Sequence, residues 1–489
     1  MSCSSQIHNF EFKMEDIQKA VKNGRLLSME IEITLKCNFQ CPYCYVPDKP
    51  APENELSMDE IMDVILQARE IGAKKIILLG GEPTIHPNIL TIIQFIRNHG
   101  LEVEMFTNGS MITKKFAKEL YKNQVRVVLK MNTFDEKLQD LLTGKKGSFK
   151  VIHKAFNNLR QAGYPSKQGF MAVSTIICRQ NLDEIPDLWR WLRNRDIAPY
   201  FEIITPQENA KKNEWLNVNP EKLKNVFYHI SEIDKEEYGY IWDPQPPLIG
   251  NRCMRHQFSC LVTSQGYVMP CVGINIPVGC IREKRLADIL KNSEVLQNLK
   301  NYRKTIKGPC CVCEKADTCY GCRGAAFQMT GDYLASDPLC WRNIDKKDEI
   351  ISLPCAIDEF IPQKPPMRVV DNITRIGERT ADVSVTISED MPFVDQDGIV
   401  DENLYLEMMA QSIAAFNGFM HAGGASFFHE GLLLGAKKLT ISGQSKVGDK
   451  LDISVFKQAR YGNFGIIKGI ISKNDEIIAS GEIKIWHKS

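Results

Sequence analysis

Apolar and polar positions alternate in two different ways along this chain of 489 residues. Between residues 28 and about 245, short apolar runs of strand length alternate with stretches whose apolar positions recur with a helical period. The predicted strands are 29–35, 75–79, 102–106, 125–129, 170–177 and 200–204, and the predicted helices are 57–71, 87–98, 114–122, 149–161 and 182–193. This alternation predicts an α/β domain with a parallel sheet. Six repeats fit both an open doubly wound sheet and a partial barrel, and periodicity does not separate the two.

A different pattern begins near residue 356 and continues to residue 489. One helical stretch, 403–420, is combined with short alternating runs at 381–387, 438–441, 451–456, 464–471 and 476–486. The pattern predicts an α+β domain in which one helix packs on a five- or six-stranded antiparallel sheet. Prolines near residues 354 and 362–366 mark a boundary at about 350–356. Residues 1–27 are expected to form an N-terminal extension.

Composition narrows the possible functions. Lys and Arg number 61 and Asp and Glu 60, and this balance is a poor fit to a protein that follows nucleic-acid phosphates. No apolar run reaches the roughly 20 residues that a membrane span needs, and residues 1–13 lack the apolar core of a signal peptide. We therefore expect a cytoplasmic protein, from an oxygen-poor host. Its 16 cysteines are then expected to bind metal or clusters rather than to form disulfides.

Three cysteines lie close together directly after the first predicted strand. Cys37, Cys41 and Cys44 are separated by three and then by two residues. A tight loop after a strand can direct three thiolates at one [4Fe–4S] cluster and leave one iron open for a small molecule. Zinc and buried structural cysteines are the alternatives, but zinc usually takes a fourth ligand from a second close pair.

This spacing, with Tyr43 before the third cysteine, resembles the radical S-adenosylmethionine (SAM) enzymes. The resemblance implies a partial (β/α)6 barrel over residues 28–245. It also implies that Cys37, Cys41 and Cys44 hold the [4Fe–4S] cluster that binds SAM, with the chemistry at the carboxyl ends of the strands. Cleavage of SAM would give a 5′-deoxyadenosyl radical that abstracts hydrogen from a substrate, and the cofactor carries that chemistry.

The resemblance also implies which residues contact SAM. The segment Gly80, Gly81, Glu82 and Pro83 resembles the one that binds the SAM amino group in this family. Thr107 and Asn108 resemble the ribose-contacting loop, although an Asn-Gly pair is in isolation an ordinary turn. Tyr43 and Ser174 are further candidate contacts. Lys130 stands where many relatives have Ser-x-Asp-Gly, and it would meet the SAM carboxylate or a substrate, or be a solvated strand end.

A second group of cysteines occupies residues 246–350. Their density, with Gly and Pro nearby, does not suit an apolar core and indicates a metal-held region. Residues 265–271 are predicted to form a hairpin ending in Cys271. The spacing resembles the SPASM extension of radical SAM enzymes, although two residues rather than three separate Cys319 from Cys322. That resemblance implies two auxiliary [4Fe–4S] clusters, one held by Cys253, Cys260, Cys271 and Cys322 and the other by Cys310, Cys313, Cys319 and Cys340.

Two features of that region qualify the expectation. Cys280 and Cys311 are left over and are able to replace a ligand in this scheme, and a four-cysteine zinc site uses similar spacing. Eight thiolates would leave no open iron, which suits electron transfer rather than substrate binding. Val272 follows Cys271, where sulfatase-maturing relatives place an acidic residue, so the same proton acceptor is absent.

Residues 356–489 resemble the hotdog fold, specifically the 3-hydroxyacyl-carrier-protein dehydratase-like group. The resemblance rests on residues 365–367, 370–371, 407–411, 435 and 447–449. It implies a catalytic carboxylate at Glu407 and a neighbouring amide at Gln411. Met391 occupies the position at which the resemblance implies the catalytic histidine. A non-dehydrating role is therefore favoured. In the alternative, a dehydratase, His421 or His429 would replace the missing base. We expect this domain to bind an acyl or carrier-protein-linked group or to act as a thioesterase. We also expect it to pair into a homodimer.

Together these features predict a radical SAM oxidoreductase with three [4Fe–4S] clusters. Its substrate would be a peptide or a molecule tethered to a carrier protein, and a flavodoxin or ferredoxin would reduce it. Neither nucleic acid nor membrane is expected as a partner. The alternatives are a bifunctional enzyme that also hydrolyses or dehydrates a thioester, a peptide or protein maturase, and a non-enzymatic iron–sulfur or zinc-binding protein.

Overall fold

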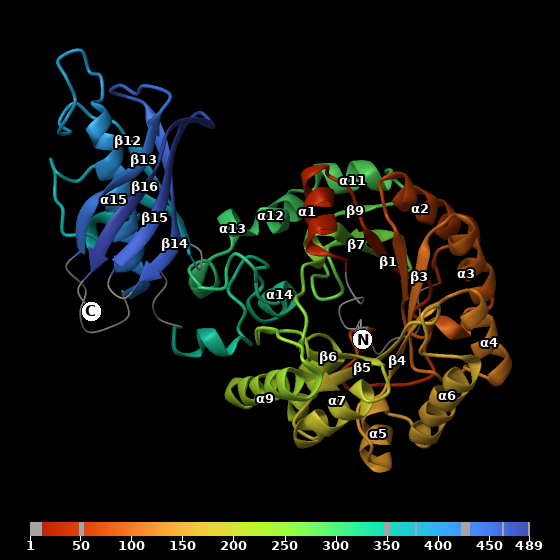
Figure 1. The fold of residues 1–489 in the computed structure, drawn as a ribbon. Helices are drawn as coiled ribbons and strands as arrows, with labels where there is room; N and C mark the ends of the chain where they lie inside the picture. The colour runs from red at the N-terminus through yellow and green to blue at the C-terminus, as the bar shows by residue number, and fades with distance from the viewer. Residues whose placement is uncertain are drawn as a thin grey trace. The chain divides into compact units, whose positions relative to one another are not determined.

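The structure is a computed structural model and describes residues 12–47, 53–346, 353–376, 379–421, 431–461 and 464–487. It divides into two compact units (Figure 1). The first unit extends to Asn301 and includes Gly321–Ile344, and the second consists of Tyr302–Tyr320 and the chain from Asp345 onward. The segment that carries Cys310, Cys313 and Cys319 therefore belongs to the second unit, whereas Cys322 and Cys340 belong to the first.

A parallel sheet forms the centre of the first unit. Its strands lie in the order β6-β5-β4-β3-β2-β1, and every neighbouring pair is parallel. Their bounds are β1 Ser28–Glu32, β2 Lys75–Leu79, β3 Glu102–Thr107, β4 Arg126–Lys130, β5 Met171–Ile177 and β6 Ala198–Ile203. Each strand pairs with the next one along the chain, without the reversal that defines a doubly wound sheet. This strand order identifies the domain as a partial (β/α)6 barrel rather than an open doubly wound sheet, a choice that periodicity had left open.

Helices cover the outer face of this sheet (Figure 1). The predicted ones are α2 Met58–Glu70, α3 Ile89–Asn98, α4 Lys114–Lys122, α6 Ser148–Ala162 and α7 Ile185–Arg193. A capping box between Ser57 and Glu60 begins α2. The helices that were not predicted include α5 Glu136–Thr143 and α9 Pro220–Tyr238, although Asn219 followed by Pro220 is a typical helix start.

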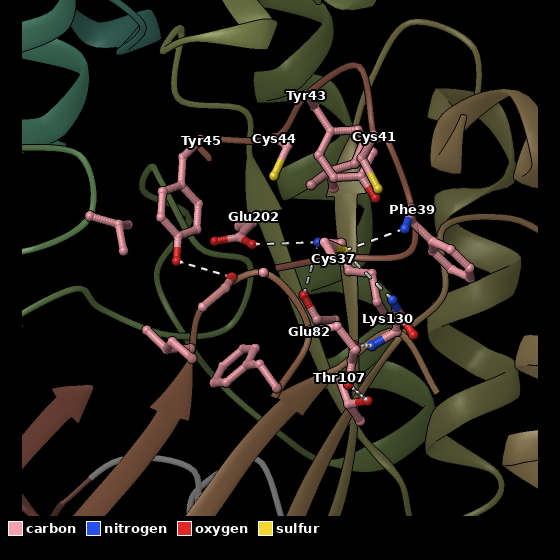
Figure 2. Close-up of a pocket in the computed structure, with 18 of the residues that line it drawn as sticks. Cys37, Phe39, Cys41, Tyr43, Cys44, Tyr45, Glu82, Thr107, Lys130 and Glu202 are labelled. Atoms are coloured by element: carbon pink, nitrogen blue, oxygen red, sulfur yellow. Dashed lines mark hydrogen bonds and ion pairs between the residues drawn. The ribbon is translucent and has the colours of Figure 1, made fainter. Parts of the chain in front are cut away.

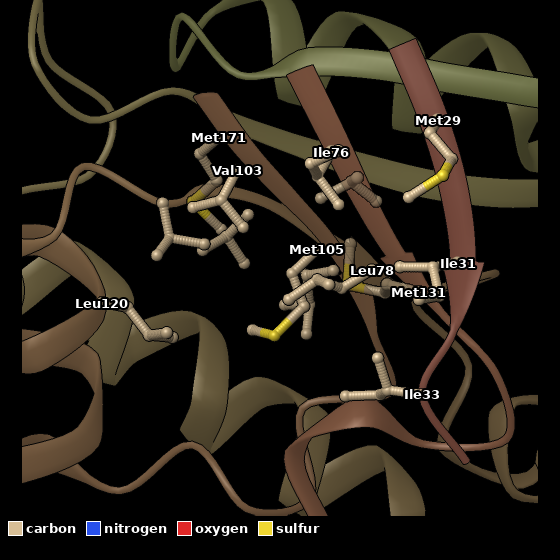
Figure 3. Packing of buried hydrophobic residues seen from close by; sticks show 14 of the residues in the cluster. Met29, Ile31, Ile33, Ile76, Leu78, Val103, Met105, Leu120, Met131 and Met171 are labelled. Carbon is tan, nitrogen blue, oxygen red and sulfur yellow. The ribbon is translucent and has the colours of Figure 1, made fainter. Parts of the chain in front are cut away.

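Alternate strand residues pack against these helices and form the main core (Figure 3). Figure 3 labels members of this core, among them Met29 of β1, Ile76 of β2, Val103 of β3 and Met171 of β5. The intervening residues face the barrel interior, and several of them are charged. Lys75 Nζ and Arg126 Nε lie 3.2 and 3.0 Å from Glu104 Oε2. Such buried charges are tolerated because they are paired.

The sheet continues beyond β1 into the cysteine-rich region. Strand β7 (Ser259–Val262) pairs parallel to β1, and β8 (Tyr267–Met269) and β9 (Gly279–Cys280) follow antiparallel. The predicted hairpin is confirmed, because β7 and β8 are joined by a turn in which Gly266 has a φ of +86°. The sheet thereby places Cys271 directly after β8, beside the barrel.

The second unit contains helix α15 (Glu402–His421) and an antiparallel sheet in the order β10-β11-β12-β14-β15-β16-β13. The strands are β10 Cys355–Ala356, β11 Asn372–Ile376, β12 Thr380–Thr386, β13 Gly431–Ile441, β14 Lys450–Tyr461, β15 Phe464–Lys473 and β16 Glu476–His487. The prediction of five or six strands was too low. Strand β11 is short and only partly apolar, and β10 has two residues, so neither gives a clear alternating signal.

Helix α15 crosses the sheet at close range. A Cβ atom on Gly469 of β15 would lie 2.4 Å from the Met409 sulfur, so a larger residue there would displace the Met409 side chain. Met409 and other apolar residues of α15, among them Leu404, Met408 and Phe416, are buried in one core with residues of the sheet. This wrapped helix is the arrangement that the hotdog resemblance implies.

Candidate functional site

Backbone contacts on both sides hold the loop that carries Cys37, Cys41 and Cys44. On one side Gly81 N donates to Thr34 O at 2.8 Å and Glu82 N donates to Lys36 O at 2.9 Å. On the other side Gln40 N donates to Thr143 O, at the end of α5, at 3.0 Å. The loop is therefore fixed between the end of β2 and α5.

Gly80 and Gly81 are required by this anchoring. A Cβ on Gly80 would lie 2.0 Å from Thr34 O, and a Cβ on Gly81 would lie 2.2 Å from Lys36 O. Gly80 also has a φ of +138°, which L side chains rarely adopt. The backbone of Thr34 and Lys36, just before the cysteine loop, therefore excludes a side chain at both glycines.

A cavity of about 250 Å³ opens between the loop and the carboxyl ends of the strands (Figure 2). The three cysteines line it together with most of the predicted SAM contacts, namely Tyr43, Gly80, Gly81, Glu82, Thr107, Asn108, Lys130 and Ser174. Pro83 does not line it, because it is buried and begins the short 3-10 turn Pro83–Ile85. The fold thus gathers at one place residues that the sequence spreads over five strand ends.

The environment of the three thiols suits a polynuclear cation. Burial raises the pKa of Cys41 to about 12 and that of Cys44 to about 11, and it also raises the pKa of Cys37. Thiols in such a site ionise only when positive charge compensates them, and cluster irons supply that charge. Lys130 lowers the pKa of Cys41 and of Cys44, and the Asn108 side-chain amide lies 3.9 Å from Cys37 Sγ. The donor set therefore fits an iron–sulfur cluster.

Glu82 is the centre of a buried hydrogen-bond network. Its Oε1 accepts bonds from Thr84 N (3.0 Å), Thr84 Oγ1 (2.5 Å) and Thr107 Oγ1 (2.7 Å), and its Oε2 accepts one from Asn108 N (2.6 Å). Burial raises the pKa of Glu82, and these donors lower it. Because a carboxylate oxygen accepts about two bonds, Oε2 retains capacity for a further donor such as an ammonium.

Lys130 is not a solvated strand end. Its ammonium lies 3.1 Å from Ser174 Oγ, 3.8 Å from Glu202 Oε1 and 5.3 Å from the centre of the Tyr43 ring. Burial lowers the pKa of Lys130, and Glu202 raises it. A partly buried ammonium facing the cavity is suited to binding a carboxylate (Figure 2).

The cavity is also lined by residues that the sequence had not singled out as SAM contacts, among them Tyr45, Glu202, Gln207 and Val272. The sequence feature that could have identified Glu202 is that it is the single acidic residue of the otherwise apolar strand β6. Gln207 Nε2 donates to Val272 O at 2.9 Å, and Asn209 N donates to Cys44 O at 3.3 Å. The segment after β6 therefore contacts both the cysteine loop and the chain that follows Cys271.

Cys271 and Cys322 lie in neighbouring segments of the first unit. Ala325 N donates to Cys322 Sγ at 3.3 Å, and Cys322 N donates to Asp337 Oδ2 at 2.7 Å. Cys253 is electrostatically close to both, whereas Cys260 lies on β7 within the main core. Cys340 is also buried, and its N–H donates to Asp337 O at 3.4 Å. Burial raises the pKa of Cys271 to about 12.

In the second unit, Gln411 connects Glu407 to the loop before β11. Gln411 Nε2 donates to Glu407 Oε1 and to Met367 O, both at 2.7 Å, while its Oε1 accepts from Val369 N at 3.0 Å. Gln411 is buried and Glu407 is partly exposed. Met391 packs against the core at the expected histidine position, and His429 lies outside the described residues.

Comparisons with known proteins agree with this geometry. Residues 31–192 match the radical SAM superfamily, residues 253–322 match SPASM, the iron–sulfur cluster-binding domain, and residues 355–489 match ApeP dehydratase. The chain is a radical SAM enzyme. This radical SAM enzyme continues into a SPASM region and a hotdog-like dehydratase domain. The expected cofactors are confirmed: SAM with a [4Fe–4S] cluster, and auxiliary iron–sulfur clusters in the SPASM domain.

Named relatives resemble about two thirds of the enzyme. An AdoMet-dependent heme synthase from Methanosarcina barkeri is 27% identical over 342 residues, which are 65% of this chain and 96% of that protein. A PqqA peptide cyclase from Bradyrhizobium diazoefficiens is 26% identical and covers 65% of this chain and 86% of its own. Streptococcus suis SuiB bound to S-adenosylmethionine shares the fold, with 16% identity, a TM-score of 0.52, and coverage of 66% of this chain and 80% of that one. The non-enzymatic alternative is thereby wrong.

Within the part of the chain that the structure describes, no helix is both long and apolar enough to cross a membrane.

Proposed function

We propose that this radical SAM enzyme abstracts a hydrogen atom from a substrate held as a thioester on a carrier protein. Reductive cleavage of SAM at a [4Fe–4S] cluster supplies the 5′-deoxyadenosyl radical for such a step. The observation that carries the proposal is that one chain combines the cysteine-lined cavity with a hotdog domain that holds an oriented carboxylate. A flavodoxin or ferredoxin is the proposed reductant.

The cavity residues divide the task of holding SAM. Cys37, Cys41 and Cys44 would hold the cluster. Glu82 Oε2 would accept the SAM ammonium, since it has one protein donor where Oε1 has three. Lys130 would bind the SAM carboxylate, because its ammonium is held at the cavity wall by Ser174 and Glu202.

The remaining cavity wall would face the substrate. It is formed by Ile203, Ile204, Thr205 and Gln207 after β6, and by Val272 after Cys271. No acidic side chain follows Cys271, so this wall provides no proton acceptor at that position. A largely apolar wall favours hydrogen abstraction from a carbon whose activation does not need a nearby base.

The hotdog domain would bind the acyl thioester without dehydrating it. Glu407 is partly exposed and is oriented by Gln411, but Met391 occupies the position of the usual base. Without an imidazole there, abstraction of a proton next to a thioester carbonyl lacks its usual agent. Strand β13 has one paired edge among the described residues and exposes Leu432 and Leu434, so we further propose pairing into a homodimer through this domain.

A peptide substrate is the second candidate. The similarity to a PqqA peptide cyclase favours it, because that relative matches 65% of the chain. A heme synthase is similar at nearly equal identity, and its name indicates a different substrate. The named relatives therefore do not identify the substrate of this enzyme.

The test uses the full-length, reduced, anaerobic enzyme with SAM. Wild type should form 5′-deoxyadenosine and Cys41→Ala should form none. Glu407→Gln should weaken binding of an acyl-carrier protein about tenfold or more, because a charged contact is lost. Glu402→Gln, an exposed change on the same helix, should leave binding unchanged. Equal binding by Glu407→Gln and wild type, or oxidation of a peptide but of no carrier-bound acyl group, would refute the proposal.

A further inference from the structure

The cysteine loop, residues 37–44, has one edge at the protein surface. Asn38 and Gln40 lie between its first two cysteines and are exposed, and so is Lys36 directly before the loop. The same loop would hold the cluster that cleaves SAM. An electron that comes from another protein therefore has a short route to the cluster through this edge.

Two segments of the barrel contact the exposed edge. Asn38 Nδ2 donates to Ser110 Oγ at 2.8 Å, which places the chain before α4 beside it. Gln40 N donates to Thr143 O at 3.0 Å, and a Cβ on Gly144 would lie 2.2 Å from Gln40 O. The chain between α5 and α6 therefore lies against the edge as well. We call the resulting surface the loop face and define it as residues 36–40, 110–115 and 141–146.

The loop face is positively charged. It has no Asp or Glu, and its five lysines, all exposed, are Lys36, Lys114, Lys115, Lys145 and Lys146. The whole chain, in contrast, has a net charge of only +1. Within the described residues, none of these five forms an ion pair with a carboxylate, whereas the nearby Lys150 lies 3.1 Å from Glu136 Oε1. Uncompensated charge of one sign attracts a partner of the opposite sign.

Four of these lysines lie where they do not stabilise the fold. Lys114 and Lys115 begin α4, and Lys145 and Lys146 directly precede Gly147, the residue before α6. The amino end of a helix carries partial positive charge, so cations near it are unfavourable. Because α6 packs against both α4 and α5 (Figure 1), the two amino ends add to the charge of the loop face. This placement favours a role in binding an acidic partner.

The loop face also has exposed apolar side chains. Met111 is 47% exposed and Leu141 is 54% exposed. Each precedes one pair of lysines, Met111 by three residues and Leu141 by four. Apolar side chains beside charged ones suit a small transient interface, in which the charges steer the approach and the apolar contact excludes water.

We propose that the loop face docks a small acidic protein that carries one electron on a flavin or on an iron–sulfur cluster. The carrier loses one electron, the cluster held by the cysteine loop gains it, and no bond forms or breaks in this transfer. The inference rests on the proposed function and deepens it, because it assigns the place at which the proposed reductant binds.

The position of the loop face favours an electron carrier over a carrier of the substrate. Residues 110–115 and 141–146 do not line the cavity. A protein bound to them approaches the cysteine loop from outside the space that SAM and substrate would share. It is therefore placed to deliver an electron but not to insert an acyl group.

The first test measures the Kd of an oxidised flavodoxin and of an oxidised [4Fe–4S] ferredoxin for the full-length chain. Wild type should bind at least one of them, and Lys145→Glu combined with Lys146→Glu should raise that Kd about tenfold or more. Lys114→Glu combined with Lys115→Glu is the second variant and should act in the same direction. Raising the ionic strength from about 0.01 to 0.15 M shortens the screening length from about 30 to 8 Å, so it should weaken binding by wild type more than binding by either variant.

Lys19→Glu combined with Lys22→Glu is the matched control. Both lysines are exposed on α1 (Met14–Lys22), and the net charge changes by the same amount. Helix α1 lies near the amino ends of the strands, because Lys74, directly before β2, contacts Asp16 at 3.4 Å. The cysteine loop follows the carboxyl end of β1, so the control should bind the carrier as wild type does.

Cleavage of SAM separates docking from damage to the cluster. With the reduced carrier as the sole donor and below saturation, the Lys145→Glu and Lys146→Glu variant should form 5′-deoxyadenosine about tenfold more slowly than wild type. With dithionite, a small reductant that needs no docking surface, the two rates should be equal. An equal loss with dithionite would overturn the proposal, because the lysines would then act on the cluster or on the fold.

Other results would also overturn it. These are an unchanged carrier Kd in both variants, an equal loss in the control, or a wild type that binds neither carrier. Weaker binding of an acyl-carrier protein with unchanged binding of flavodoxin and ferredoxin would assign the loop face to the substrate instead.

The binding measurements need no substrate, so the two proposals fail separately. Oxidation of a peptide and of no carrier-bound acyl group would refute the proposed function and leave the docking surface in place. An unchanged carrier Kd would remove the docking surface and leave the proposed substrate as it was.

Discussion

The contact between Gly81 and the cysteine loop allows a sharp test of how the loop is positioned. In Gly81→Ala the new Cβ would lie 2.2 Å from Lys36 O, 2.5 Å from Leu35 O and 2.6 Å from the Lys36 carbonyl carbon. Ordinary contact begins at 3.4 Å, and all three atoms belong to backbone rather than to a flexible side chain. The backbone before Cys37 must therefore move by roughly 1 Å, the misplacement that typically costs about 100-fold in rate.

The same overpacking should lower the free energy of unfolding by about 1–3 kcal/mol. Gly100→Ala is the matched control. Gly100 has a φ of +76°, but a Cβ there would meet nothing within 4 Å. The control should therefore lose about 1–2 kcal/mol of stability through its left-handed backbone alone. Its 5′-deoxyadenosine formation should remain that of wild type.

The assay is the rate of 5′-deoxyadenosine formation by the reduced, reconstituted enzyme at saturating SAM, together with denaturant unfolding of each variant. If Gly81→Ala and Gly100→Ala lose stability equally and both retain the wild-type rate, the glycine does not position the loop. A rate loss in Gly81→Ala that vanishes at higher SAM concentration would also contradict the reasoning, because a displaced cluster is not restored by ligand.

Three further changes test other parts of the molecule. Burial raises the pKa of Glu32 from 4.5 to about 7, so its neutral form stabilises the fold below about pH 4.5 and this contribution is lost as the pH rises through 7. Glu32→Gln should remove this dependence, worth roughly 3 kcal/mol, and parallel unfolding curves for both proteins between about pH 5 and 8 would contradict it. Lys130→Met should raise the Kd for SAM about 10- to 100-fold through the lost charged contact, whereas an unchanged Kd would assign Lys130 to the substrate. Gln411→Ala should destabilise the second unit by about 2–4 kcal/mol, because Val369 N and Met367 O lose their partner, while the exposed Gln458→Ala should stay within about 0.5 kcal/mol. Unfolding of the full-length Gln411→Ala and Gln458→Ala variants, compared with wild type, measures this difference in stability.

Much of the barrel was predictable because its signals are local. The apolar run of each strand and the helical period between strands are properties of neighbouring residues, so the strands β1 to β6 were all found. The cysteine loop was found for the same reason, since Cys37, Cys41 and Cys44 fall within eight positions. Weak or short local signals failed. Strand β11 alternates poorly, and most of the edge strand β13 is solvent-exposed, so only 438–441 of it was predicted.

Other conclusions depended on contacts between distant residues. The sequence predicted Gly80 and Gly81 only as part of a SAM-binding segment, and the structure shows in addition that the backbone of Thr34 and Lys36 leaves no room for a side chain at either position. Lys130 had three possible environments until β5 and β6 placed Ser174 and Glu202 beside it. A sequence pattern cannot give the separation of residues 44 or 72 positions apart, because that separation is set by strand order and register.

The sequence by itself determined the chemistry: three cysteines in one loop, a cysteine-rich region after the barrel, and a separate domain with Glu407 and Gln411 one helical turn apart. Only the tertiary structure decided between a doubly wound sheet and a partial barrel, because that depends on which strands pair. It also decided that Cys260 lies in the main core, since a residue's face of the sheet follows from its register with β1. Spacing along the chain fixes which donors exist, and pairing of strands fixes which of them meet.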